Sequence, residues 1–533
     1  MYNNYTPLQQ RQLALQVYSN TQSTYLLVYA PARSTALKAT LTDQLHRKFR
    51  LVDRLGGELT ASVDGVLLAA EDVELMSTAL MYFAKALQDG ADYAVCNAVF
   101  GFGGVTALYQ SQPLQAQNRC AVVSRTLLER CRAAAHDPEN VPELLALAAQ
   151  LCTKPTLIPQ ALLHYERGIC AEDAFSAHGK RAFIMSHVLD MTGAPIVLVS
   201  AVPVLRSMGY EVLVLGPSDG GSLHLFLDAG ASVITRSSCR NVSDAWGMAL
   251  CADFVIANTV VMARAVRALS GTAVPVLWWL HDAFAGYPHI AHQIPTQLGE
   301  NVRVYSVGSH AANAMRAVRP EFEIRPLIYG LPDYAAENFI RTDLGYNRGR
   351  PLFATVGSFE RRKGHDIFCK AIRLLPPEVR EKASFLFVGQ AADKEMMDSV
   401  RALTADYPEN VYYCKRLTRD EIKSLMEQCT GLVCASRDDP MPTFVTEGLI
   451  FGKPSIVSEH TGTAGLISEG RNGFVYHNDD PQQLAVLLEH AIEHPEELAS
   501  MRTECRKMYE QYYSKEAFEQ TLRAAVEDLT AKK

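Results

Sequence analysis

Two acidic residues separated by seven positions mark the segment SRDDPMPTFVTEG, residues 436–448. Asp439 precedes a Pro-Met-Pro stretch that interrupts regular structure, and Glu447 follows it. The apolar run GLVCAS predicts a strand that ends at Ser436, and TFVTEGLIFG predicts a helix whose first turn suits Pro442. The segment is therefore predicted to follow the carboxyl end of a strand, where open α/β sheets bind ligands.

The predicted helix start could bind a phosphate. The N–H groups of Thr443 and Phe444 have no partner inside a helix that begins there, and they point out of its positive end. A purely structural alternative is that Asp439 caps the helix and Glu447 is a solvated helix acid. Spacing alone leaves both interpretations open.

A second segment, VGSFERRKGHD at 356–366, follows the first strand of the same predicted unit. Gly357 and Ser358 allow close approach of the backbone, and Arg362 and Lys363 add two cations. A diphosphate leaving group needs such cations, because its developing charge must be balanced without free water. The alternative is a solvated Arg-Arg-Lys turn.

Strand and helix patterns alternate from about residue 180 onward. After residue 350 the predicted strands are PLFATVGSF, ASFLFVGQ, NVYYCKRL, TGLVCAS and PSIVSEH. Between 180 and 335 they are RAFIMSHVL, YEVLVLGP, ADFVIANT, VPVLWWLHD and VRVYSVGS, and DMTGAPIVL opens a helix after the first. This rhythm predicts an α/β protein with two parallel, Rossmann-like units that face each other across a cleft.

We expect three domains, 1–172, 173–340 and 341–533, in a chain of 533 residues. The segment AEDAFSAHGK is the predicted linker into the second domain, and the last helix of the third is expected to cross back to the second.

Composition narrows the class of partner. A content of 48% hydrophobic and 20% charged residues, with a net charge of -7, is typical of a soluble globular protein without a nucleic-acid footprint. Twelve scattered cysteines, an N-terminus unlike a signal peptide and the lack of a long apolar run predict a cytoplasmic protein. Peripheral contact with the inner face of a membrane stays open, as does the oligomeric state.

The C-terminal motifs resemble a known family. DPMPTFVTEG, with VGSFERRKG upstream and GLISEGRNGFVY downstream, resembles the nucleotide-sugar-binding domain of retaining glycosyltransferases of family 4, also called group 1. The resemblance covers about 180–533 and implies the GT-B fold. The family carries a Glu-x7-Glu motif, in which Asp439 takes the first position and Glu447 the second.

The resemblance implies a role for each residue. Glu447 would bind the ribose hydroxyls of the donor, and Asp439 would lie near the transferred sugar as a catalytic residue. Backbone contacts near Arg416 and Leu417 would hold the base, and the family often has Arg at the position of Ser358. The implied donor-binding residues are Gly193, Ser358, Arg362, Lys363, Arg416, Leu417, Pro442, Thr443, Phe444 and Glu447.

The middle segment fits the same family. SHVLDMTGAPIVL resembles its glycine-rich loop, with Gly193 near the donor phosphates. VLWWLHD resembles the strand end that supplies the active-site histidine, so His281 would contact the transferred sugar or the acceptor as a catalytic residue. Family relatives often have Glu after this histidine, where Asp282 is shorter. Considered without the family, a histidine beside Trp278 and Trp279 is more often a packed side chain.

The first 170 residues differ. LLAAEDVELMSTALMYFAKALQDGADYAVCN, NRCAVVSRTLLER and PQALLHYERG are similar to the later part of family 2 glycosyltransferases, which have a GT-A fold. Those enzymes bind a divalent metal through Asp-x-Asp at a strand end, whereas this chain has Ala70-Glu71-Asp72-Val73. We therefore expect a degenerate, non-catalytic GT-A-like accessory domain.

The resemblance implies a retaining hexosyltransferase that moves a sugar from a UDP- or GDP-linked donor to a glycan or lipid-linked acceptor, in cell-surface polysaccharide or glycoconjugate synthesis. No cofactor and no metal are expected, since fixed cations and N–H groups balance the leaving charge. Two alternatives stay open. One is a non-catalytic glycosyltransferase-like partner or glycan-binding protein, and the other is a sugar-nucleotide epimerase with the GT-B fold.

Overall fold

The computed structural model describes residues 23–29, 35–41, 44, 46–55, 59–70, 73–76, 78–102, 106–110, 119–165, 179–218, 220–236, 239 and 248–531. The chain forms two compact units, Met1–Ile256 and Ala257–Lys533. This division follows backbone contacts, and the three predicted domain boundaries stay a prediction.

The first part of the first unit is a mixed sheet with a core on each face. Alternate residues of β1 enter different cores, with Leu26 and Val28 on the side of α3 and Leu27 and Tyr29 on the side of α4 and α5. Strand β1 pairs in parallel with β2 and β3, while β7 runs antiparallel to β3. The elements are β1 (Leu26–Tyr29), α2 (Thr35–Thr40), β2 (Phe49–Val52), β3 (Gly65–Ala69), β4 (Glu74–Leu75), α3 (Ala79–Gln88), β5 (Tyr93–Phe102), β6 (Thr106–Gln110), β7 (Cys120–Ser124), α4 (Arg125–Ala134), α5 (Val141–Leu151) and β8 (Pro155–Tyr165).

The GT-A-like character of this part stays a prediction. Glu71 and Asp72, which occupy the position of the metal-binding motif in the resemblance, lie outside the described residues, as does most of the predicted linker.

The second part of the first unit has the predicted strand and helix alternation. Strands β9, β10 and β11 run parallel in that order. Helix α6 begins at Gly193, directly after the turn that follows β9, as the sequence predicts. The elements are β9 (Lys180–Met185), α6 (Gly193–Ser207), β10 (Tyr210–Gly216), α7 (Leu223–Asp228), β11 (Ser232–Arg236) and η3 (Met248–Cys251), and β12 (Phe254–Asn258) contains the boundary between the units.

The second unit opens with three more parallel strands in the order β15-β14-β13. All five residues of β13, VLWWL, are buried, as expected for a strand that is covered on both faces. The elements are η4 (Val260–Met262), α9 (Ala263–Leu269), β13 (Val276–Leu280), η5 (Phe284–Gly286), η6 (Ala291–Gln293), β14 (Val302–Ser306), α10 (Ser309–Arg316) and β15 (Ile324–Pro326).

The rest of the second unit is a six-stranded parallel sheet in the order β18-β17-β16-β19-β20-β21. Local signals set its helices: Thr418 and Glu421 form a capping box at α14, and Asp480 caps α16. The strands are β16 (Leu352–Val356), β17 (Ser384–Val388), β18 (Val411–Cys414), β19 (Gly431–Cys434), β20 (Ser455–Ser458) and β21 (Gly473–Tyr476). The helices are η7 (Arg361–Lys363), α11 (His365–Leu374), α12 (Pro377–Arg380), α13 (Lys394–Asp406), α14 (Arg419–Gln428), α15 (Thr443–Ile450), η8 (Ala464–Leu466), α16 (Pro481–Glu493), α17 (Pro495–Ser500), α18 (Arg502–Met508), η9 (Tyr509–Tyr513) and α19 (Lys515–Thr530).

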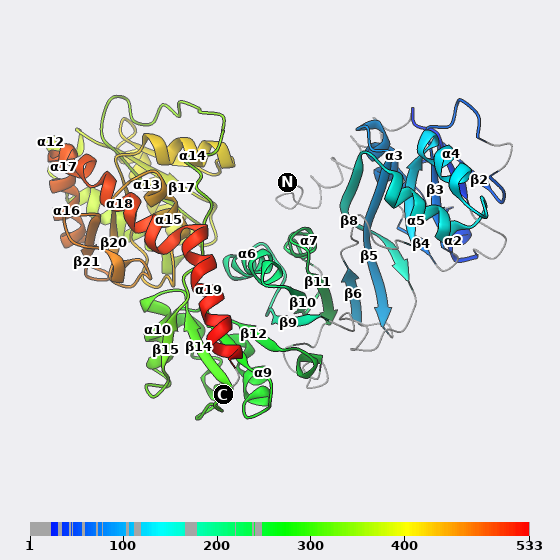
Figure 1. Cartoon of the computed structure of the whole chain (residues 1–533). Helices are drawn as coiled ribbons and strands as arrows, with labels where there is room; N and C mark the ends of the chain where they lie inside the picture. Colours follow the sequence, from blue (N-terminus) through cyan, green and yellow to red (C-terminus); the bar gives the residue numbers. More distant parts are fainter. Residues whose placement is uncertain are drawn as a thin grey trace. The chain divides into compact units, whose positions relative to one another are not determined.

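Helix α19, red in Figure 1, packs against β13. The rings of Phe518 and Trp279 stack with their centroids 5.8 Å apart, and both side chains are almost fully buried. Arg325 of β15 forms an ion pair with Asp528 at 2.7 Å. The helix thus packs against β13, a strand that precedes it by more than 200 residues, and forms an ion pair with β15.

We predict that Phe518→Ala lowers the free energy of unfolding by about 3–5 kcal/mol, because it leaves a cavity against Trp279. Urea unfolding followed by tryptophan fluorescence measures the change. Val486→Ala, at a side chain that is 64% exposed, is the control and should change the free energy by less than about 0.5 kcal/mol. Equal effects of the two variants would contradict the packing role of α19.

Candidate functional site

The carboxyl ends of β16 and β19 bring the two predicted motifs together. The strand order runs outward from this pair in both directions, so the connections change direction between them. Open parallel sheets bind ligands at such a switch point. Arg437 N–H donates to Arg362 O at 2.7 Å, and a Cβ on Gly364 would lie only 1.8 Å from Ala435 O. Gly364 also has φ +65°, so this turn requires glycine on both counts.

Lys363 and Asp439 form an ion pair at the centre of this contact. Lys363 Nζ lies 2.6 Å from Asp439 Oδ2, and Asp439 is 3% exposed. The Asp439 carboxylate also accepts from Ser436 Oγ at 3.4 Å and from Met441 N–H at 3.3 Å. The lysine ammonium has three N–H groups, so the pair leaves two of them for a ligand.

Arg362 and Ser358 both donate to the carboxylate of Glu360, a residue that was not among the predicted site residues. Glu360 Oε1 accepts from Ser358 Oγ at 2.6 Å and from Arg362 Nη2 at 3.1 Å. Burial opposes ionisation of Glu360, but the Ser358 hydrogen bond and the charges of Arg362 and Lys363 hold its pKa below the ordinary value. Glu360 therefore stays charged and fixes the side chains of both predicted residues.

Helix α15 begins at Thr443, with Pro442 as its N-cap residue. The predicted helical segment TFVTEGLIFG thus begins at the correct residue, but Pro442 precedes the first turn and is not part of it. Strand β19 ends at Cys434, two residues before the predicted end at Ser436. The first helical hydrogen bond runs from Val445 N–H to Pro442 O, so the N–H groups of Thr443 and Phe444 precede the helical ladder. The helix start is therefore shaped to receive an anion.

Glu447 is 7% exposed and pairs with Arg419, the first residue of α14. Arg419 Nη1 lies 2.6 Å from Glu447 Oε1, and the guanidinium stacks on the Tyr334 ring at 4.2 Å. Burial opposes the charge of Arg419, but the nearby Glu447 carboxylate raises its pKa above the ordinary value. The solvated-acid alternative for Glu447 is therefore not what the structure shows.

Arg416 and Leu417 lie in the loop between β18 and α14, three and two residues before Arg419. The Arg416 carbonyl accepts from Cys414 Sγ at 3.3 Å. This position is at the carboxyl end of β18, on the same edge of the sheet as Asp439 and Lys363. Their role in holding a base stays a prediction.

His281 directly follows β13, as predicted, and its ring lies 4.7 Å from the ring of Trp279. The indole N–H groups of both tryptophans donate to backbone carbonyls, Trp278 to Thr259 and Trp279 to Leu327, so the strand end is firmly held. Asp282 accepts from Val260 N–H at 2.6 Å. Burial raises the pKa of Asp282 to about 6, although the N–H groups of Val260 and His281 oppose the shift.

Gly193 belongs to the first unit, where it is the exposed first residue of α6. A Cβ added to it would meet no atom within 4 Å, so no close packing requires glycine there. Its predicted approach to the donor phosphates stays a prediction.

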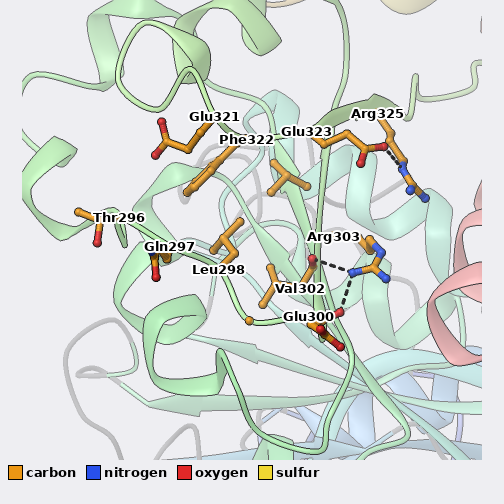
Figure 2. A pocket seen from close by; sticks show the side chains of 12 residues that line it. Thr296, Gln297, Leu298, Glu300, Val302, Arg303, Glu321, Phe322, Glu323 and Arg325 are labelled. Atoms are coloured by element: carbon orange, nitrogen blue, oxygen red, sulfur yellow. Dashed lines mark hydrogen bonds and ion pairs between the residues drawn. The ribbon is translucent and has the colours of Figure 1, made fainter. Parts of the chain in front are cut away.

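A cavity of about 510 Å³ occurs elsewhere in the second unit (Figure 2). It lies at the amino ends of β14 and β15, among segments 296–304 and 321–325, and none of the predicted site residues lines it. Glu323 and Arg325 in its wall form an ion pair at 2.9 Å, as Figure 2 shows. Because parallel sheets bind substrates at the opposite edge, this cavity is not the candidate site.

No group of three or more His, Cys, Asp or Glu side chains that could hold a metal ion occurs among the described residues. In the same part of the chain, no helix has both the length and the apolar character that a membrane crossing needs.

Two family models match the chain. Residues 178–318 match Glycosyl-transferase family 4, and residues 336–508 match Glycosyl transferases group 1. An uncharacterised glycosyltransferase of Methanocaldococcus jannaschii is 25% identical over 194 residues, which is 36% of this chain and 53% of that protein. Spore coat protein SA of Bacillus subtilis is 26% identical over 160 residues, 28% of this chain and 41% of that protein. The chain thus spans about half the length of these curated relatives.

Solved structures share the fold. The crystal structure of Anabaena HepE in complex with UDP superposes with a TM-score of 0.55 at 18% identity and covers 66% of this chain and 100% of that one. The same protein in complex with UDP-glucose gives 0.54 at 16% identity, with the same coverage. The α/β fold with two Rossmann-like domains, GT-B, is therefore confirmed.

The raised pKa of Asp282 predicts a pH-dependent stability. Its carboxyl contributes stability that is present below the ordinary value of 3.8 and lost as pH rises through about 6. Asp282→Asn has no such loss, so its melting temperature relative to the wild type should rise between pH 4.5 and pH 7, by the equivalent of about 2 kcal/mol. Differential scanning fluorimetry measures it, with the exposed Asp398→Asn as control. A difference that is constant across this range would contradict the prediction.

Proposed function

We propose that this chain, whose residues 178–318 and 336–508 carry glycosyltransferase domains of the GT-B superfamily, transfers a sugar from a nucleoside diphosphate sugar with retention of configuration. The observation that supports this most is the Lys363–Asp439 pair beside the start of α15 at the sheet's switch point. It combines a cation, an acid and free helical N–H groups in one place, which suits a diphosphate joined to a sugar.

The positive groups act on the leaving diphosphate. The bond between the sugar C1 and the diphosphate oxygen breaks, and its electron pair leaves with the diphosphate. Lys363, Arg362 and the N–H groups of Thr443 and Phe444 balance that charge, and they are already fixed before substrate arrives, so little reorganisation is needed. The acceptor hydroxyl bonds to C1 on the same face and gives its proton to the departing phosphate oxygen. No metal is required for this step.

Asp439 and His281 are proposed to contact the reacting sugar. Asp439 holds Lys363 with one carboxylate oxygen and would lie beside the C1 position, where positive charge develops. His281 is held at the end of β13 by the buried Trp279, which fixes its ring direction. Asp439 is shorter than the family's Glu at this position, which would change the preferred sugar or leave a site that binds without reacting.

The nucleotide is proposed to lie along α14 and α15. Glu447 uses one oxygen for Arg419, and its second oxygen is available for a ribose hydroxyl. The backbone at Arg416 and Leu417 would hold the base. Uracil is the first base to test, because Anabaena HepE, which shares the fold, is crystallised with UDP and UDP-glucose. A guanine-linked donor is the second.

A glycan or lipid-linked acceptor is proposed, in the synthesis of cell-surface polysaccharide or glycoconjugate on the cytoplasmic side of a membrane. The match to a spore coat protein, a component of a cell surface layer by its name, supports this class.

Lys363→Ala should lower sugar transfer by about 10²–10³-fold, because one fixed donor to the leaving diphosphate is lost. Release of nucleoside diphosphate, together with the glycan product, measures turnover. Lys370→Ala is the matched control, since Lys370 is 61% exposed and pairs with Asp366 on α11 instead. Turnover by Lys363→Ala at the level of Lys370→Ala would refute the assignment.

Glu447→Ala should remove the thermal stabilisation by UDP or GDP. A ligand at 100 times its Kd stabilises the folded state by about 2.7 kcal/mol, which a melting curve resolves easily. The exposed Glu395→Ala on α13 is the control and should keep the full shift in melting temperature.

A screen of nucleotide sugars for their effect on the melting temperature of the wild type would identify the donor. Binding without transfer or hydrolysis under any acceptor would favour the non-catalytic alternative.

A further inference from the structure

The Asp438 carboxylate connects segments that lie 128 to 154 residues apart in the sequence. Its Oδ1 accepts from the Phe284 N–H at 3.1 Å, and its Oδ2 accepts from the Ala285 N–H at 2.7 Å. His310 Nε2 lies 2.7 Å from Oδ1. Because an ionised carboxylate only accepts hydrogen bonds, the Nε2 atom carries the proton. One acid therefore binds the loop after β13 and the first turn of α10 at the same time.

This contact is buried and charged. The side chain of His310 is 5% exposed and that of Asp438 is 13% exposed. Burial favours the neutral acid, but the hydrogen bonds from His310 and from the two N–H groups outweigh it and hold the pKa of Asp438 below its ordinary value. Asp438 is consequently ionised throughout the neutral range, and a carboxylate in this position is well compensated.

The same residue is bonded to Arg362, which with Lys363 forms the proposed clamp for the donor diphosphate, called here the diphosphate clamp. Asp438 N–H donates to Arg362 O at 3.4 Å, and Arg362 Nη1 donates to Asp438 O at 3.4 Å. Its neighbour Asp439 pairs with Lys363. On the other side, Phe284 and Ala285 follow His281 by only three and four residues. Asp438 therefore connects the proposed diphosphate clamp directly with the loop that carries the proposed catalytic histidine.

Tight packing accompanies the contact. A Cβ on Gly308, just before α10, would lie 2.8 Å from Met441 Cε and 3.2 Å from Gly462 O. The Phe284 and His310 rings are 5.1 Å apart, and the His310 and His460 rings are 5.6 Å apart. The start of α10 therefore packs closely against the loops after β19 and β20, because a side chain at Gly308 would push these segments apart.

We infer that Asp438 is a positioning residue for sugar transfer: it fixes the 282–286 loop, and with it His281, relative to the donor-binding loop. Its effect on turnover rests on the proposed function. Its effect on the loop does not, because the hydrogen bonds to Phe284 and Ala285 form without substrate. An acid close in sequence to η5 could accept the same two N–H groups and would stabilise this short helix equally well. Asp438 comes instead from the donor-binding loop after β19, so it also links donor binding to the position of the 282–286 loop.

Asp438→Asn tests the inference, because the amide keeps the shape but loses the charge and one acceptor. Hydrogen exchange by mass spectrometry should show faster exchange of the peptide at 282–290 than in the wild type. Turnover should fall about tenfold to a hundredfold, as for a small displacement of a catalytic group, while UDP or GDP raises the melting temperature as in the wild type. This pattern separates lost positioning from lost donor binding. Asp398→Asn is the exposed control.

His310 supplies the second pair of variants. His310→Leu removes the donor and should reproduce the faster exchange, whereas His310→Gln offers an amide N–H to Asp438 and should restore slow exchange and most of the turnover. Wild-type exchange at 282–290 in Asp438→Asn would overturn the inference, as would faster exchange with unchanged turnover. If the wild type transfers no sugar from any donor, the proposed function fails, and the exchange result still decides whether Asp438 holds the loop.

Discussion

The close approach of the backbone between β16 and β19 is the constraint on which the site depends. These parallel strands stand at the point where the connections change direction, and the turn after β16 bonds directly to the loop after β19. A side chain at Gly364 would collide with the Ala435 carbonyl. Only because the two loops touch can Lys363 reach Asp439, so the electrostatic arrangement follows from the topology of the sheet.

The acids of the site are paired before any ligand is present. Asp439 contacts Lys363, Glu447 contacts Arg419, Glu360 contacts Arg362 and Asp438 contacts His310. Each pair holds a charged side chain in one direction and thereby lowers the reorganisation that a charged substrate would otherwise cause. Such pairing also explains how several charges can lie at a largely buried strand edge.

The strand and helix around Asp439 could be predicted from the sequence because the patterns that mark a strand and a helix start are both local. Strand runs such as TGLVCAS and helix starts such as Pro442-Thr443 depend on neighbours in the chain, and the structure places them within two residues of the prediction. Arg419 and Glu360 were not predicted as site residues because they lie among other charged residues, and His310 was not predicted because it lies among small residues that form no recognisable motif. Nothing in the residues near Arg419 shows that its partner is Glu447, 28 positions later. The sequence around Trp279 likewise does not indicate that Phe518 stacks on its indole ring. Partners across the fold are set by tertiary packing, and a single sequence does not display them.

The position of α19 has a consequence for synthesis of the protein. Trp279 on β13 leaves the ribosome 239 residues ahead of Phe518, its stacking partner. At translation rates of about 5–20 residues per second, that interval is roughly 10–50 s. During this time the face of β13 that α19 later covers remains open, although it carries one of the largest apolar side chains of the unit. The packing of β13 is therefore completed only after the last helix has been synthesised, and until then the apolar side chain of Trp279 is available for association with other chains.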